Sequence, residues 1–69
     1  MPHAIEPGQI RANETGDRLI YVEGPAWRLD EWSCMVLWPH LPQARARVGV
    51  ASASEILRDY PLVCTLEVR

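Results

Sequence analysis

The sequence predicts a mostly β protein: a small barrel of about five short strands, with one helical turn before the last strand. Segments rich in β-branched and aromatic residues alternate with turn-forming residues, as in small all-β domains. A serine-led capping sequence precedes the last of these strand-like segments. With 69 residues, 48% of them hydrophobic, the chain is expected to form one domain, residues 1–69, around one small core.

The N-terminal third begins with a turn. Pro7-Gly8 predicts this turn, and a short extended segment follows it. Residues 13–17 are polar, include a glycine and predict a loop. The segment Arg18–Glu23 is rich in β-favouring side chains and stops at Gly24-Pro25, so it is predicted to be a strand.

A connection over Trp27–Glu31 leads to the second clear strand, Trp32–Trp38. Alternation divides this strand into two faces, Trp32, Cys34, Val36 and Trp38 against Ser33, Met35 and Leu37. Because both faces are largely apolar, we expect this strand to be central or covered on both sides. Pro39 ends it, since proline cannot donate to a strand ladder.

The C-terminal part combines strands with the helical turn. Ala46–Ala51 is predicted to be a strand, with its valines facing one way and its arginines the other. Ser52-Ala53-Ser54-Glu55 fits a capping box, in which the first hydroxyl accepts from the Glu55 amide and the glutamate reaches back. A short helix or 3₁₀ turn over Ala53–Asp59 is expected to follow and to stop before Pro61. The last strand, Leu62–Val68, is expected to place Leu62, Cys64, Leu66 and Val68 on one face.

Short strands around a small core, with a helical turn before the last, describe a small SH3-like barrel. Closure of such a barrel would remove the open strand edges that invite pairing with other chains. An open sheet of three or four strands with one helix is the competing architecture.

Several of these segments carry a resemblance: Ile5 to Ile10, Arg18 to Val22, Val48 to Leu57, and Tyr60-Pro61-Leu62-Val63. In these positions the chain resembles short phage and prophage proteins, which open with a Pro-Gly-Gln turn and end on a Tyr-x-Leu-Val strand. The resemblance implies the SH3-like barrel and no particular activity. The chain departs from the pattern at Arg11, where an aromatic residue is usual, and at residues 51–54, where a basic strand is expected. Both departures weaken an inference of nucleic-acid contact.

The formal net charge is −2, and all seven basic residues are arginines. This predicts no general attraction to nucleic-acid backbones or anionic membranes. No apolar run approaches the roughly 20 residues of a membrane span. Met1 to Ile10 has no signal-peptide features, so we expect a cytoplasmic protein.

The two cysteines, Cys34 and Cys64, are expected to be reduced and buried in the same core. They are too few for a zinc site unless His3 and His40 join them, and no close pair of ligands occurs. We therefore expect no metal and no cofactor.

Catalytic pairings are weak in this sequence. Cys34 and His40 form the strongest one, yet extended geometry separates their side chains by roughly 15–20 Å. Asp30 and Glu31 are adjacent and would point to opposite faces of an extended segment. The glycines are scattered singly, so there is no phosphate-binding loop. The chain is predicted not to be an enzyme.

Aromatic and basic residues suggest binding instead. Three tryptophans fall within twelve residues, and so small a core can hide one or two of them, which leaves at least one exposed. Exposed tryptophan beside arginine is typical of a binding hot spot, and Trp38 with its neighbouring prolines resembles the edge of a peptide groove. The predicted partner-binding residues are Trp27, Arg28, Trp38, His40, Arg45 and Arg47.

The sequence therefore favours a non-enzymatic protein-interaction module of phage or mobile-element type, with the Trp38 to Arg47 loop as its contact surface. Its narrower form is an inhibitor of a host machine such as a bacterial defence complex. One alternative is a small β-barrel that binds single-stranded nucleic acid through its arginines and tryptophans. The other is a structural homo-oligomer, with tryptophans filling a dimer interface.

Overall fold

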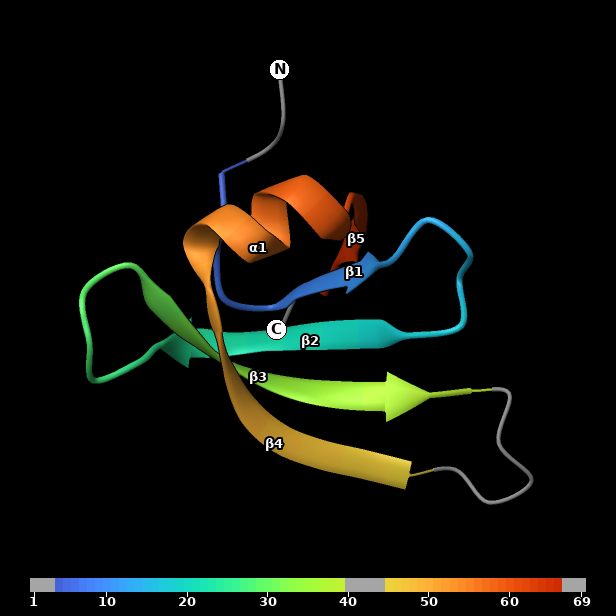
Figure 1. Ribbon diagram of the computed structural model, residues 1–69, viewed down its shortest axis with the longest axis horizontal. Coiled ribbons are helices and arrows are strands. Elements are labelled where there is room, and N and C mark those ends of the chain that lie inside the picture. Colours follow the sequence, from blue (N-terminus) through green and yellow to red (C-terminus); the bar gives the residue numbers. More distant parts are fainter. Residues whose placement is uncertain (1–3, 40–44, 67–69) are drawn as a thin grey trace.

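The computed structural model describes residues 4–39 and 45–66 (Figure 1). Its strands form a five-stranded antiparallel sheet in the order β4-β3-β2-β1-β5. In chain order, the elements are β1 (Gln9–Ala12), β2 (Leu19–Pro25), β3 (Glu31–Trp38), β4 (Arg45–Ser52), α1 (Ala53–Asp59) and β5 (Leu62–Thr65). The predicted mostly β class, and the helix before the last strand, are confirmed.

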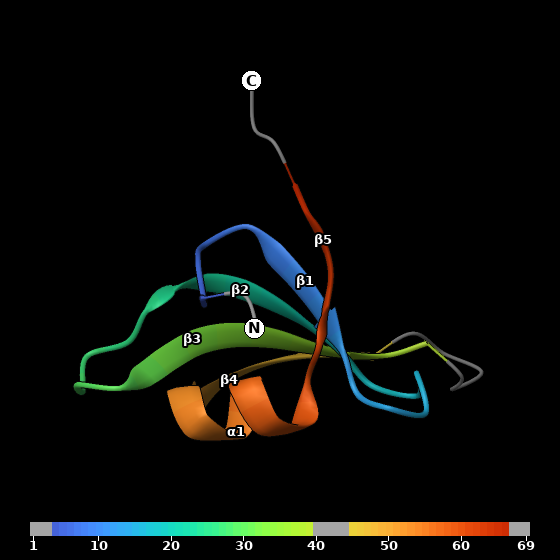
Figure 2. The same ribbon diagram turned by 90° about the horizontal axis from the view of Figure 1, so that it is seen from above.

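The sheet is a meander from β1 to β4, and the chain then crosses over through α1 so that β5 pairs with β1. Hydrogen bonds do not close this sheet into a barrel, so β4 and β5 are its two edges. Figure 2 shows α1 against one side of the sheet. With seven residues, this helix falls far short of a membrane span, and none of the described chain forms a helix able to cross one.

The helix begins where its capping chemistry predicts. Ser52 has extended backbone angles, and its hydroxyl accepts a hydrogen bond from the Glu55 amide at 3.2 Å. This is the forward half of the predicted capping box. The reciprocal bond from the Glu55 carboxylate is not found among the described residues. At the other end, the Tyr60 amide donates to the Ile56 carbonyl at 2.9 Å and closes the last turn.

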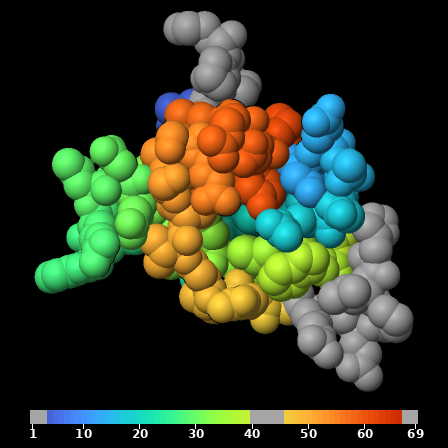
Figure 3. Space-filling model, viewed as in Figure 1, coloured from blue at the N-terminus to red at the C-terminus, as the bar shows by residue number. Residues whose placement is uncertain are grey.

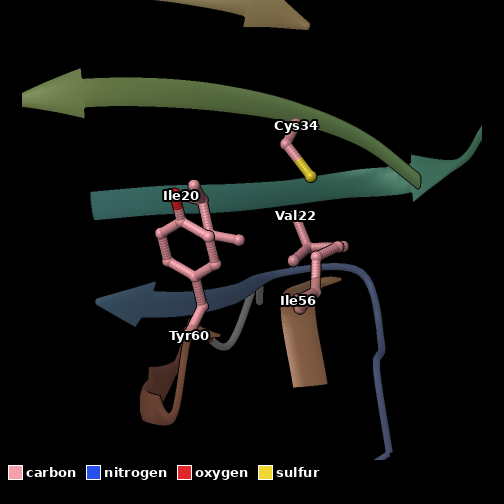
Figure 4. Close-up of a cluster of buried hydrophobic side chains, with 5 residues drawn as sticks. All are labelled: Ile20, Val22, Cys34, Ile56 and Tyr60. Atoms are coloured by element: carbon pink, nitrogen blue, oxygen red, sulfur yellow. The ribbon is translucent and has the colours of Figure 1, made fainter. Parts of the chain in front are cut away.

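A small hydrophobic core lies between α1 and the sheet, and Figure 3 shows α1 lying over this side of the strands. Figure 4 shows the buried side chains pointing toward one another from β2, β3, α1 and the residue that caps it. They are Ile20, Val22, Cys34, Ile56 and Tyr60. Such a core leaves a thin margin of stability.

The side of the sheet that faces α1 carries Arg47 of β4 rather than the valines of that strand. Cys34, in the core, pairs with Gly49, and Val36 pairs with Arg47. Directly opposite residues of antiparallel strands share a face. Val48 and Val50 therefore lie on the opposite face, where they are 67% and 61% exposed.

We call that opposite face the outer face. Most of the side chains that the register places there are apolar, and Glu31, the first residue of β3, is charged. They are Ile10, Ala12, Leu19, Tyr21, Glu31, Ser33, Met35, Leu37, Ala46, Val48, Val50, Ser52 and Cys64. β3 lies between β2 and β4, which confirms its predicted central place.

The prediction that both cysteines are buried in one core is wrong for Cys64. Cys34 is 1% exposed, whereas Cys64 is exposed on β5. The register explains the difference: Ile10 pairs with Cys64 but the next residue, Arg11, pairs with Leu62. Val63 is therefore an extra residue, a β-bulge, and it moves Cys64 to the outer face. The strand also ends at Thr65, short of the predicted Val68, which lies outside the described residues.

Candidate protein-interaction surfaces

The predicted binding residues are divided between two ends of the sheet. Trp27 and Arg28 lie in the connection between β2 and β3, whereas Trp38 is the last residue of β3. The eight residues of β3 separate these ends by about 23 Å. Arg45 pairs with Trp38 at the second end, and His40 lies outside the described residues.

Residues 26–30, which connect β2 to β3, form what we call the hairpin tip. The Ala26 amide donates to the Glu31 carbonyl at 3.0 Å, and the Glu31 amide donates to the Arg28 carbonyl at 3.3 Å. Asp30 adopts a left-handed conformation, with φ of 62°, which aspartate tolerates better than most residues. Its carbonyl also accepts from the Ala53 amide at 2.7 Å. The tip is thus tied to the start of α1 as well as to its own strands.

Two large apolar side chains project from this hydrogen-bonded tip. Trp27 is 96% exposed and Leu29 is 92% exposed, with Arg28 exposed between them. Figure 3 shows the tip as a protrusion from the body of the molecule. The expectation that at least one tryptophan is exposed is confirmed. Leu29 was not among the predicted residues, although its place beside Trp27 in a turn was a usable signal.

At the other end of β3, Trp38 already contacts another side chain of the same chain. Trp38 is half-buried, and the Arg18 guanidinium carbon lies 5.7 Å from the centre of its ring. Arg18 also donates to the Tyr60 hydroxyl at 3.2 Å, and this hydrogen bond is the main cause of its raised pKa. One face of the Trp38 ring is therefore covered by a cation–π contact within the chain.

An open groove of about 720 Å³ lies beside Tyr60, between the loop after β1 and the end of α1. Its charged residues have both signs: Arg18 and Arg58 against Glu14, Glu55 and Asp59. Arg58 pairs with Asp59 at 3.0 Å, and this hydrogen bond lowers the pKa of the carboxyl. The local charges largely compensate, so the groove has no strong preference for an anion or a cation.

A buried polar cluster was not predicted at all. Arg11 is 1% exposed and Gln9 is 2% exposed. The Arg11 guanidinium donates to Gln9 Oε1 at 3.0 Å and to the Tyr60 carbonyl at 2.9 Å, and Gln9 Nε2 donates to the Ala4 carbonyl at 2.8 Å. Burial lowers the Arg11 pKa. This arginine therefore holds the fold together and is not part of an exposed basic surface.

Two features of the described residues bear on covalent and metal chemistry. Burial raises the pKa of the Cys34 thiol, which keeps it protonated and unreactive at neutral pH. The described residues contain no group of three or more histidine, cysteine or acidic side chains able to hold a metal ion. Among the large hydrophobic side chains of the described residues, Trp27 and Leu29 of the hairpin tip are the most exposed.

Comparison with known proteins gives no match: no protein-family model fits the chain, and no curated protein or solved structure is significantly similar.

Proposed function

We propose that this protein is a protein-interaction module that binds its partner through the hairpin tip. The carrying observation is the near-complete exposure of Trp27 and Leu29 on a loop fixed by backbone hydrogen bonds. Tryptophan and arginine are the residue types most enriched in binding hot spots. A loop that is already ordered loses little conformational entropy when it binds.

The tip suits an apolar pocket on a protein better than a nucleic acid. It carries one arginine and one aspartate, and the whole chain has a net charge of −2. The alternative, single-stranded nucleic acid, needs aromatic faces free for stacking beside several cations. At Trp38, Arg18 already lies over the ring. The contact surface is accordingly placed at the tip rather than in the Trp38 to Arg47 region.

The fold that supports the tip is proposed to be an SH3-like barrel left open between β4 and β5. Support comes from the element order, with a helical turn before a last strand that returns to β1. Inhibition of a host machine, such as a bacterial defence complex, remains the narrower form of the proposal. It depends on the identity of the partner.

The test compares capture of partner proteins from host lysate by the wild type, Trp27→Ala and Leu29→Ala. Each tip variant should weaken the capture of a specific protein by about 30-fold or more, the effect expected of a hot-spot residue. Leu57→Ala, an exposed leucine on α1, is the matched control and should capture normally. Because Trp27 and Leu29 are exposed, neither tip variant should change the unfolding midpoint appreciably.

Equal capture by the wild type and both tip variants would refute the assignment of the tip. A bound oligonucleotide whose retention falls steeply with added salt would favour the nucleic-acid alternative instead.

A further inference from the structure

The two edges of the open sheet differ in how well they are protected from pairing. β5 has four residues, contains a bulge and follows Pro61, all features that blunt an edge strand. β4 has eight residues and pairs with β3 in one unbroken register from Arg45 to Ser52. In Figure 1 no described element lies beyond β4. A long, regular and unbulged edge is the kind that pairs with another strand.

The register shows which backbone groups of β4 point away from the sheet. The Ala53 amide donates to the Asp30 carbonyl, which makes these two residues a hydrogen-bonded pair next to the end of the ladder. Hydrogen-bonded pairs alternate along antiparallel strands. The amides of Arg47 and Gly49 therefore point toward β3, and those of Ala46, Val48 and Val50 point outward at the open edge.

We propose that β4 pairs antiparallel with β4 of a second copy of this chain, about a two-fold axis that passes beside Val48. The two sheets would then form one continuous ten-stranded sheet, two copies of the five strands present here. Val48 of each copy would exchange two backbone hydrogen bonds with Val48 of the other. This surface is separate from the hairpin tip, so the inference does not depend on the proposed function.

The side chains of β4 fit this register on both faces. On the outer face, Val48 meets Val48 of the second copy, and Ala46 meets Val50. On the other face, Arg47 lies opposite Gly49, so no arginine stands directly opposite another. A two-fold axis at Arg47 would instead oppose two like charges, which is destabilising. The side chains of β4 are therefore complementary when the axis lies at Val48, and they disfavour the register with the axis at Arg47.

A second copy is the occupant that the sequence of β4 favours. On the outer face, the paired stretch presents only Ala46, Val48 and Val50, while Glu31 lies beside Ser52, beyond the paired residues. Joining two copies therefore buries no ion on that face. A chain of 69 residues with a small core also gains from association, as short domains commonly do. Seven residues of each strand would pair, residues 45–51, which is a small interface, so the dimer should be weak and dependent on concentration.

The experiment measures molar mass by light scattering across a concentration series from about 5 to 500 μM, a range suited to weak dimers. The wild type should pass from 7.8 kDa toward twice that value as its concentration rises. Val48→Pro removes the outward amide without removing a bond to β3, and it should raise the dimer dissociation constant at least about 10-fold. Val48→Thr keeps the amide and the β-branch, so it should dimerise like the wild type.

A second pair of variants tests the surface independently. Val50→Lys on β4 should weaken the dimer, whereas Val63→Lys on β5 should not, although both valines are 61% exposed. The wild-type unfolding temperature should also rise with protein concentration. That measurement remains informative even if a variant fails to fold. A wild type that stays at 7.8 kDa throughout, or a Val48→Pro variant that dimerises normally, would overturn the proposal.

Discussion

The buried arginine gives the sharpest test of how this fold is held together. The Arg11 guanidinium joins β1 to the chain just after α1 through the Tyr60 carbonyl, and it fixes Gln9 Oε1 beside it. Replacing Arg11 with methionine keeps most of the side-chain volume but removes every donor. The expected result is a large loss of stability, because two buried acceptors lose this donor.

The magnitude follows from the hydrogen bonds. An acceptor left unsatisfied in the interior costs about 1–3 kcal/mol, so two of them cost about 2–6 kcal/mol. Arg11 also donates to the Ala4 carbonyl at 3.5 Å, but this acceptor is not counted, since it keeps the bond from Gln9 Nε2. The methionine variant does not bear the free-energy cost of burying a charge, and this gain offsets part of the loss. We therefore expect a net loss of about 3 kcal/mol. A domain of 69 residues has only about 3–10 kcal/mol to lose.

Urea denaturation followed by circular dichroism measures the change, with thermal unfolding as a second assay. A loss of about 3 kcal/mol would lower the unfolding temperature by roughly 12–24 °C in a domain of this size. Arg11→Lys is the control variant, because it keeps the charge and some donors but not the planar fork, and it should lose less. If Arg11→Met is within about 0.5 kcal/mol of the wild type, the hydrogen bonds contribute nothing net and the reasoning fails.

Three further predictions test the local structure. In native protein a thiol reagent should label Cys64 rapidly and Cys34 only after denaturation, because the first is exposed and the second is buried; rapid labelling of both would contradict this. Ser52→Ala should cost about 0.5–2 kcal/mol by removing the N-cap, and an unchanged urea midpoint would exclude that role. Because burial raises the Cys34 pKa above the ordinary thiol value of 9.0, the stability that this thiol contributes is complete below pH 9 and is lost as the pH rises through the folded-state pKa. The difference in unfolding free energy between the wild type and Cys34→Ala should therefore shrink at alkaline pH, and a constant difference would contradict the assignment.

Features set by neighbouring residues were predictable from the sequence. The bounds of α1 agree with the prediction because a serine N-cap and the proline after Tyr60 act within a single turn. The strands also fall where β-favouring side chains gather between turns. These signals do not depend on which other segment each strand meets.

Features set by distant segments were not predictable. Alternation along β4 separates its valines from its arginines, but it does not say which set faces α1. The bulge at Val63 depends on how β5 meets β1, and it moved Cys64 out of the expected core. The burial of Arg11 gave no signal in the sequence, because its partners are a nearby glutamine and a carbonyl 49 positions away. The sequence also did not show that the predicted binding residues lie apart, with Trp27 and Trp38 at opposite ends of β3.

The positions of the hairpin tip and the β4 edge together predict how many partner molecules a dimer binds. The tip lies near the Ser52 end of β4, because Glu31, which follows the tip, pairs with Ser52. A two-fold axis beside Val48 reverses the strand direction, so the two tips of a dimer would point to opposite ends of the joined sheet. They could not both bind one flat partner, and no gain from bivalent binding is expected. The dimer should instead bind two partner molecules, each with the affinity of a single tip. Val48→Pro should therefore form a one-to-one complex with the same dissociation constant per tip as the wild type. A weaker dissociation constant per tip for this variant would show that the β4 edge takes part in partner binding, contrary to the separation of the two surfaces.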